Sequence, residues 1–330
     1  MKQAKKTKEG KTKKLFVQKT PTSNNFGLGE FCFNDYAPIW DCGKMIDKIP
    51  FKGESICRTT AHNFELVKKL GIKTHFIKSI STTSFQAKLV RVLNPENTLK
   101  RNSTNFLIPL EVIFRRAFPK ESSMLRRLKS GEISIEDVGL KRIPKALETL
   151  KTPILDYTTK LEKIDRHLSK NNAQELAALS DKEMLAVNEM TLFINDFISK
   201  RADEIGIGYA DGKIELAMGP KRELLLVDDF GNLDENKFFV GKTYLSNQII
   251  ADASLKTNWG QEMRKAEFGL PFKQETSPSL PKETLLLASD MHKSFCEAWT
   301  GKKIWGAPKL EVIADRIKEH TEKIKASELD

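Results

Sequence analysis

The chain has 330 residues, of which 39% are hydrophobic and 30% are charged, and its formal net charge is +11. This composition can form the core of one large domain or two ordinary ones, and it argues against global disorder. No apolar run approaches the length of a membrane span, and no apolar signal core follows the lysine-rich start. The four cysteines form no Cys-x-x-Cys pair, so we expect reduced thiols, no zinc site and a cytoplasmic location.

Positive charge is concentrated at the N-terminus, where residues 1–14 hold seven lysines and one glutamate. We expect residues 1–9 to form a basic, flexible tail that contributes mainly to solubility. No basic stripe interleaved with aromatic residues follows, so the sequence disfavours a nucleic-acid role. The basic remainder favours small anions, of which phosphates are the commonest.

The first third of the chain is rich in predicted strands. Alternating patterns predict strands over residues 10–18, 29–35, 74–80, 87–93 and 109–118, the last three as successive strands of one antiparallel sheet. Between them, residues 59–71 predict a helix, because Phe64, Val67 and Leu70 share a stripe and Gly71 ends it.

The remainder of the chain is more helical. Helices are predicted over residues 122–130, 180–206, 282–298 and 311–325, with a hairpin over 207–228 and a Pro/Ser-rich loop over 271–283. Ser180 and Glu183 form a predicted capping box at the start of the longest helix. The order indicates an α+β fold with a β-rich lobe over 10–108, a larger α+β lobe over 109–330 and a hinge near 107–110. Two unequal lobes favour a nucleotide cleft between them.

The most informative chemical pattern lies in the predicted hairpin. Asp211, Lys213 and Glu215 alternate along its first strand and therefore share one face, and Asp228 and Asp229 end its second strand. Grouped carboxylates suit Mg²⁺, and a lysine beside them suits a phosphate. From these residues alone, a solvated hairpin face with a surface ion pair explains the pattern equally well.

Two other segments have residues suited to phosphate. Gly10, Lys11 and Lys13 open the first strand, where glycine permits close backbone approach and the lysines share a face. Because this is neither a P-loop nor a Gly-x-Gly-x-x-Gly fingerprint, a lysine-rich strand start is the simpler interpretation. Arg115 and Ser123 suit a phosphate monoester, although an amphipathic strand and helix with solvated arginines explains them equally well.

The ordered set of fragments resembles the SAICAR synthetases (phosphoribosylaminoimidazole-succinocarboxamide synthases), over roughly residues 10–260. The fragments that carry the resemblance are "GKTK", "FNDYAPIWD", "KGES" with "FELVKKLGIKTHFI", "PLEVIFRR" with "SSMLRR", "PILDYTTKLEKIDRHL", and "DGKIELAMG" with "LLLVDDFGNLDENKF". Each fragment alone is a weak signal, but six in the family's order are a strong joint signal.

The resemblance implies a two-lobed α+β fold whose small antiparallel N-lobe is similar to that of protein kinases, with ATP between the lobes. It implies that ATP, CAIR (carboxyaminoimidazole ribonucleotide) and L-aspartate give SAICAR, ADP and phosphate through an acyl phosphate, with Mg²⁺, in de novo purine biosynthesis. The partners would be these small molecules, with a homo-oligomer as an open alternative and with no membrane.

The resemblance also implies residue roles. Lys213, Glu215 and Asp228 would be catalytic, with Glu215 and Asp228 holding Mg²⁺. The ATP-binding residues would be Gly10, Lys11, Lys13 and Glu111. The substrate-binding residues would be Asp35, Asp41, Arg115, Ser122, Ser123, Lys160, Asp165, Asp211 and Lys237, of which Arg115, Ser123 and Lys237 would hold the CAIR phosphate.

Four positions depart from the family pattern: Glu121, Asp229, Lys237 and Ala251 stand where glycine, glutamate and two arginines are expected. They leave open a divergent paralogue that keeps the ATP site but ligates another carboxylate and amine. A non-catalytic nucleic-acid- or protein-binding module using the lysine tail is a third hypothesis. The intact Lys213, Glu215 and Asp228 set argues against that module.

Overall fold

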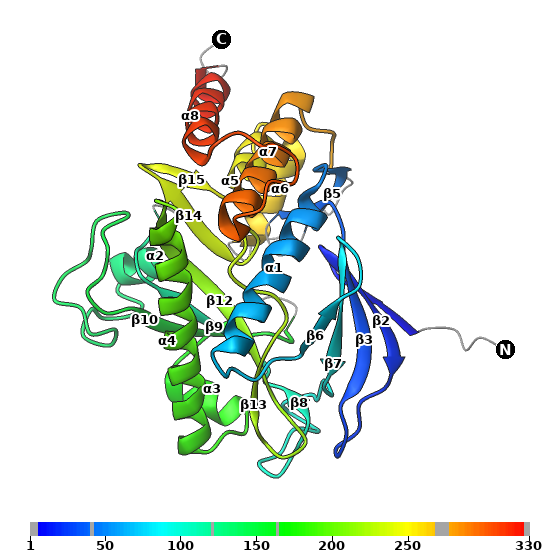
Figure 1. Cartoon of the computed structure of the whole chain (residues 1–330). Coiled ribbons are helices and arrows are strands. Elements are labelled where there is room, and N and C mark those ends of the chain that lie inside the picture. Colours follow the sequence, from blue (N-terminus) through cyan, green and yellow to red (C-terminus); the bar gives the residue numbers. More distant parts are fainter. Residues whose placement is uncertain (1–5, 40–42, 120–121, 163–164, 268–276, 327–330) are drawn as a thin grey trace.

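The N-terminal lobe is built on a five-stranded antiparallel sheet in the order β1-β2-β3-β7-β6 (Figure 1). In this computed structural model the described residues are 6–39, 43–119, 122–162, 165–267 and 277–326. The strands of the sheet are β1 (Lys6–Glu9), β2 (Lys13–Lys19), β3 (Gly27–Phe33), β6 (Phe76–Ser79) and β7 (Ser84–Leu89). A separate two-stranded ribbon consists of β4 (Tyr36–Ile39) and β5 (Gly43–Lys48).

Helix α1 (Lys52–Lys69) packs on this sheet through an aromatic cluster. The ring of Phe64 stacks on Phe76 at 5.4 Å and meets Phe230 of the other lobe edge-on at 5.1 Å. Because Phe64 is fully buried between the two lobes, the lobes share one continuous hydrophobic core.

The C-terminal lobe contains an eight-stranded sheet in which β12 (Gly208–Met218) is the longest strand. Its first half pairs with β9 and β14, and its second half pairs with β13 and β8. The remaining strands are β8 (Phe106–Leu107), β9 (Leu110–Arg115), β10 (Ile154–Thr159), β11 (His167–Leu168), β13 (Leu224–Val227), β14 (Asn236–Val240) and β15 (Thr243–Leu245). Backbone bonds between Leu226 and the segment Lys73–His75 join β13 to the N-lobe.

Helices cover the outside of this sheet and reach back to α1 (Figure 1). Helix α7 contacts α1 and α8, and Trp299 of α7 donates its indole N–H to Asn63 of α1 at 2.7 Å. The helices are α2 (Ser123–Ser130), α3 (Lys170–Leu176), α4 (Asp181–Glu204), α5 (Gln248–Ser254), α6 (Asn258–Glu267), α7 (Lys282–Thr300) and α8 (Leu310–Ala326). None of the helices within the described ranges is both long and apolar enough to cross a bilayer.

Most predicted elements are confirmed, and the molecule has a two-lobed α+β fold. The capping box is present, since Ser180 accepts from the Glu183 N–H and the Glu183 carboxylate accepts from the Ser180 N–H. The hairpin predicted over 207–228 consists of β12 and β13. Residues 271–276 of the predicted loop over 271–283 lie outside the described residues, 277–281 form no helix or strand, and the end of the segment already belongs to α7.

Three predictions are wrong in detail, and one strand was not predicted. The expected flexible tail over 1–9 includes a strand, because Lys6–Glu9 pair with β2 through backbone bonds that a lysine-rich pattern hides. Strand β9 belongs to the C-lobe sheet and not to the sheet of β6 and β7. Helix α1 starts at Lys52 and not at residue 59, because the carboxylate of Asp35, which is distant in sequence, accepts the Gly53 N–H in its first turn. Residues 154–159, for which the sequence patterns predicted no element, form β10 against β9.

Candidate active site

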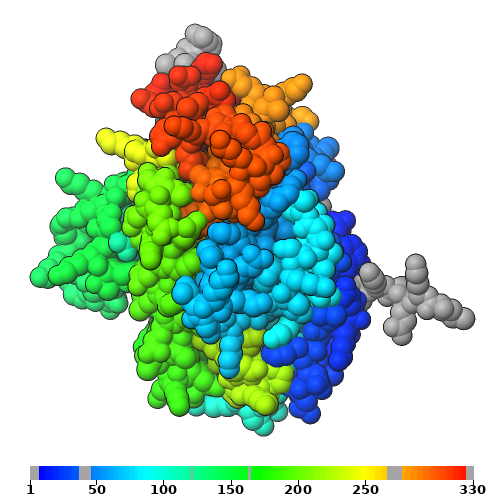
Figure 2. All heavy atoms as spheres, in the orientation of Figure 1, coloured from blue at the N-terminus to red at the C-terminus, as the bar shows by residue number. Residues whose placement is uncertain are grey.

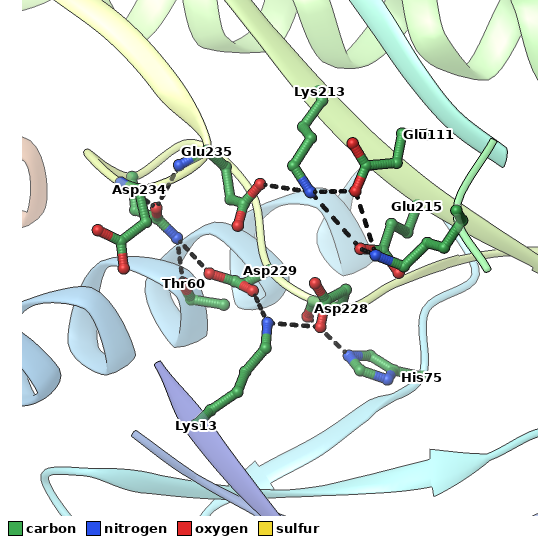
Figure 3. A network of polar contacts seen from close by, with 12 residues as sticks. Lys13, Thr60, His75, Glu111, Lys213, Glu215, Asp228, Asp229, Asp234 and Glu235 are labelled. Atoms are coloured by element: carbon green, nitrogen blue, oxygen red, sulfur yellow. Dashed lines mark hydrogen bonds and ion pairs between the residues drawn. The ribbon is translucent and has the colours of Figure 1, made fainter. Parts of the chain in front are cut away.

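Lys213 lies at the centre of a network of buried charges where the lobes meet (Figure 3). Its Nζ lies 2.9 Å from a carboxylate oxygen of Glu111 and 2.9 Å from one of Glu235. The pairing of β12 with β9 places Glu111 beside Lys213, and Glu235 comes from the loop before β14. Burial alone would lower the pKa of Lys213, but Glu235, Glu215 and Glu111 outweigh it and raise that pKa well above its ordinary value.

Lys160, which directly follows β10, is a second cation in the network. Its Nζ lies 2.6 Å from Glu215 and 3.2 Å from Glu111. Lys213 approaches the same oxygen of Glu215 at 3.6 Å, so both glutamates lie between two ammonium groups. Burial, together with the nearby charge of Asp228, raises the pKa of Glu215 to about 7. Burial would also raise the pKa of Glu111, but the two lysines lower it below its usual value.

Asp228 and Asp229 receive a third cation from the N-lobe. Lys13 of β2 contacts both carboxylates, and its Nζ lies 2.5 Å from Oδ1 of Asp228. Asp228 has a φ of 63°, a left-handed conformation that side chains other than glycine rarely adopt. His75 stabilises this backbone by donating from Nε2 to the Asp228 carbonyl oxygen at 3.0 Å. Non-glycine residues held in such conformations are concentrated at functional sites.

The carboxylates of Asp228, Asp229 and Glu235 converge on one point. One oxygen of each lies within 4.8 Å of the others. Burial raises the pKa of Glu235 to about 8, and burial with the neighbouring charge of Asp228 raises that of Asp229. Burial would also raise the pKa of Asp228, but Lys13, Lys160 and Lys213 outweigh it and lower that pKa below its usual range. The set therefore joins one ionised carboxylate with two whose ionised form a divalent cation would stabilise, and its oxygen ligands fit Mg²⁺.

Hydrogen bonds join the loop that carries these acids to helix α1. Asn232 donates from Nδ2 to Asp229 at 2.8 Å and to the Thr60 hydroxyl at 3.0 Å. Asn63 donates to the carbonyl oxygen of Phe230 at 2.9 Å. The acidic loop therefore takes its position from a helix of the opposite lobe.

A buried ion pair holds the far end of the same loop. Lys52, whose side chain is 1% exposed, places Nζ 2.5 Å from Asp234. Asn247 donates to the other oxygen of Asp234 at 2.8 Å, and His292 donates from Nε2 to Asn247 at 3.1 Å. Sequence reasoning gave no role to Lys52, Asp234 or Glu235, because no local pattern connects Lys52 with the two acids. The two adjacent acids in "LDEN" were the sequence feature that could have indicated these residues.

A second cluster surrounds Arg115 at the end of β9. Its guanidinium lies 3.1 Å from Asp211 and 3.1 Å from Asp156, and it donates to the Ser123 hydroxyl at 3.4 Å. The Ser122 hydroxyl is buried and has no hydrogen-bond partner in the part of the chain that the structure describes. The structure thus brings together four residues predicted to bind substrate and adds Asp156, which sequence reasoning missed. Asp211 pairs with Arg115, and because no register shift separates it from Lys213, the two side chains share one face of β12 as predicted.

The other predicted site residues have separate positions in the fold. Asp35 accepts the Gly53 N–H at 2.9 Å and so caps α1. Gly10 and Lys11 form the exposed turn between β1 and β2, where the Gly10 N–H donates to the Lys13 carbonyl oxygen at 2.9 Å. Two further predicted residues lie on or next to strands of the C-lobe sheet. Lys237 is exposed opposite Asp211 on β14, and Asp165 is half-buried just before β11. Asp41 and Glu121 lie outside the described residues.

Comparisons with known proteins identify the family of this chain. The SAICAR synthetase family profile matches residues 6–256. A protein of Archaeoglobus fulgidus, provisionally described as a phosphoribosylaminoimidazole-succinocarboxamide synthase, is 36% identical over 335 residues, covering 94% of this chain and 99% of the relative. The enzyme of that name from Thermoplasma acidophilum is 33% identical over 282 residues, covering 83% of this chain and 93% of its own.

Two solved structures share the fold at lower identity. A type-2 SAICAR synthetase in complex with ADP aligns with a TM-score of 0.62 and 20% identity, covering 91% of this chain and 99% of that one. A SAICAR synthase from Saccharomyces cerevisiae complexed with SAICAR aligns with a TM-score of 0.66 and 19% identity, covering 92% and 98%. The family profile and the relatives above 30% identity show that this chain belongs to the SAICAR synthetase family.

Proposed function

We propose that the network around Lys213 is the catalytic centre of this enzyme. As a SAICAR synthetase, the enzyme ligates L-aspartate to the carboxylate of CAIR in purine biosynthesis and converts ATP into ADP and phosphate. The observation that carries the assignment is the meeting of three lysines and five carboxylates from both lobes in one buried network (Figure 3).

The reaction requires positive charge at fixed positions. A carboxylate is a poor acyl donor, so ATP first phosphorylates it, and the aspartate amine then attacks the acyl phosphate. Both steps gather negative charge on oxygens that are transferred or displaced, and preorganised cations stabilise such charge. Glu111 and Glu235 hold the Lys213 ammonium from two sides, so it would meet the transferred phosphoryl group without reorganising.

Mg²⁺ would be held by Glu215 and Asp228, with Asp229 and Glu235 close enough to Asp228 to share in the coordination. When bound, the cation would supply charge stabilisation to the phosphate oxygens. Lys13 neutralises Asp228 and Asp229 from the N-lobe, and Gly10, Lys11 and Lys13 would then face the ATP phosphates. The structural relative solved with ADP supports nucleotide binding by this fold.

The Arg115 cluster would bind CAIR through Arg115, Ser123 and Lys237, with Ser122 supplying an unused hydroxyl. The wider set of substrate-binding residues that we propose also includes Asp35, Asp41, Lys160, Asp165 and Asp211. We further propose a cytoplasmic location, because Cys57 and Cys296 are buried free thiols among the described residues.

The test is ADP release by the purified protein with Mg-ATP, CAIR and L-aspartate, omitting one substrate at a time. We expect release to require all three. Release without CAIR or aspartate, or no release at all, would contradict the proposal. Lys237 is exposed and stands where the family has arginine, and lysine cannot form the bidentate fork of arginine. For this reason the assay should be repeated with other amines. A clear preference for another amine would identify the divergent paralogue instead.

A further inference from the structure

The molecule has a hollow on the N-lobe side of the β12–β13 turn, away from the catalytic network. Its volume is about 370 Å³, and Lys73, Thr74, Phe76, Lys88 and Glu223 are among the residues that line it. A second hollow of about 470 Å³ shares Phe26, Lys73 and Glu223 with the first, and we call the pair the hairpin trough. In Figure 2 the yellow-green atoms of this turn lie at the foot of the molecule beside blue N-terminal atoms.

The hairpin trough has an excess of uncompensated positive charge. Lys68, Lys73, Lys88 and Lys221 line it, whereas Glu223 is its single acidic residue. Within the described residues, none of these four lysines has a carboxylate within 4.0 Å, and Glu223 accepts the backbone N–H of Lys221 at 2.8 Å. Such a set of ammonium groups attracts a phosphate.

Aromatic rings hold two of these ammonium groups. The Nζ of Lys88 lies 5.2 Å from the centre of the Phe26 ring, and that of Lys68 lies 5.5 Å from the Phe76 ring. Phe26, Ile72 and Leu225 add apolar surface to the lining. The hairpin trough therefore has ammonium groups that could bind an anion, next to an apolar lining that could contact a flat ring.

Thr74 provides an independent sign of a missing partner. Thr74 is among the residues that line the hollow, it is 6% exposed, and its buried hydroxyl has no hydrogen-bond partner within the described residues. A buried hydroxyl left without a partner costs about 1–3 kcal/mol, so such groups usually bind a water or a ligand.

We propose that the hairpin trough binds a phosphorylated small molecule with a flat apolar body, of the class of nucleoside monophosphates. The lysines bind the phosphate, Thr74 makes a hydrogen bond, and the apolar lining contacts the base. The volume of the first hollow lies within the range of about 300–1,000 Å³ that is usual for small-molecule sites.

Binding at this site is connected to the acidic loop. The next residue after Thr74 is His75, whose N–H donates to the Leu226 carbonyl oxygen at 3.0 Å and whose Nε2 donates to that of Asp228 at 3.0 Å. A ligand on Thr74 thus acts one residue away from the group that holds Asp228. We expect it to change the KM for ATP, a consequence that rests on the proposed function, whereas the binding itself does not.

The test is equilibrium dialysis of labelled AMP with the full-length protein and three variants. The double variant K73E/K88E reverses two exposed charges in the hairpin trough. The matched control K129E/K242E makes the same change at two exposed lysines outside both hollows. T74V removes the unpartnered hydroxyl and keeps the shape of the side chain.

Loss of two charge-assisted contacts should weaken AMP binding at least about tenfold in K73E/K88E, while T74V should weaken it about two- to fivefold. The control should bind as the unmodified protein does, and inorganic phosphate should bind at least about tenfold more weakly than AMP. Equal AMP binding by K73E/K88E, or an equal loss in the control, would overturn the site. Equal affinity for phosphate and AMP would overturn the assignment of a flat body. Because dialysis measures no turnover, these outcomes are independent of the ligase assay.

Discussion

The lysines of the catalytic network and those of the hairpin trough are in opposite electrostatic environments. Lys13, Lys160 and Lys213 are partly or largely buried, and each contacts at least two carboxylates. The lysines of the trough, represented by Lys73 and Lys88, are exposed and have no carboxylate partner among the described residues. The network is therefore fixed before substrates arrive, as electrostatic catalysis requires. The trough instead keeps its charge available for an incoming anion.

The largest effect is expected where charge is most deeply buried. K52M leaves Asp234 unpaired in the interior, so it should lower the free energy of unfolding by about 3–5 kcal/mol. The double variant K52M/D234L removes both charges and should recover most of that loss. Urea unfolding of both variants measures the difference. A double variant no more stable than K52M would show that the pair contributes through more than mutual neutralisation.

K213M should abolish most catalysis while keeping the length of the side chain. Removing one preorganised donor typically lowers kcat by about 10²- to 10³-fold. Steady-state ADP release measures this, and K242M, an exposed lysine beyond β14, is the control that should keep full activity. If K213M retained more than about a tenth of the activity, Lys213 would not be the group that stabilises the transferred phosphoryl.

A smaller effect is expected for R115K. Lysine keeps the charge but cannot contact Asp156, Asp211 and a phosphate at once, since it lacks the planar fork. We expect the KM for CAIR to rise about tenfold with the KM for ATP unchanged, which corresponds to about 1.4 kcal/mol. A rise in the KM for ATP instead would place Arg115 at the nucleotide.

The smallest expected effect is a change in AMP binding with salt concentration, which distinguishes the exposed lysines of the trough from the buried lysines of the network. Raising ionic strength from about 0.05 M to about 0.5 M shortens the Debye length to a few ångströms, so it should weaken AMP binding to the trough several-fold. The buried pairs are screened much less, and the midpoint of urea unfolding should change little. Salt-independent AMP binding would contradict a site based on exposed lysines.

Local patterns in the sequence were sufficient to predict most helices and strands and part of the candidate site. Alternation along β12 placed Lys213 and Glu215 on one face, and the ordered fragments indicated the ATP-dependent ligase family. Contacts between distant segments were not visible in these patterns. Glu235 meets Lys213 only because β14 pairs beside β12, and Asp156 meets Arg115 only because β10 pairs with β9. Lys52 and Asp234 are 182 residues apart, so no periodicity could connect them.

The backbone conformation of Asp228 has a consequence for how this chain varies. Glycine would relieve a left-handed φ of 63° by about 1 kcal/mol, but it would also remove the carboxylate that pairs with Lys13. A search for stabilising substitutions that considers backbone conformation alone would therefore choose glycine at residue 228 and lose the ion pair that joins the two lobes there.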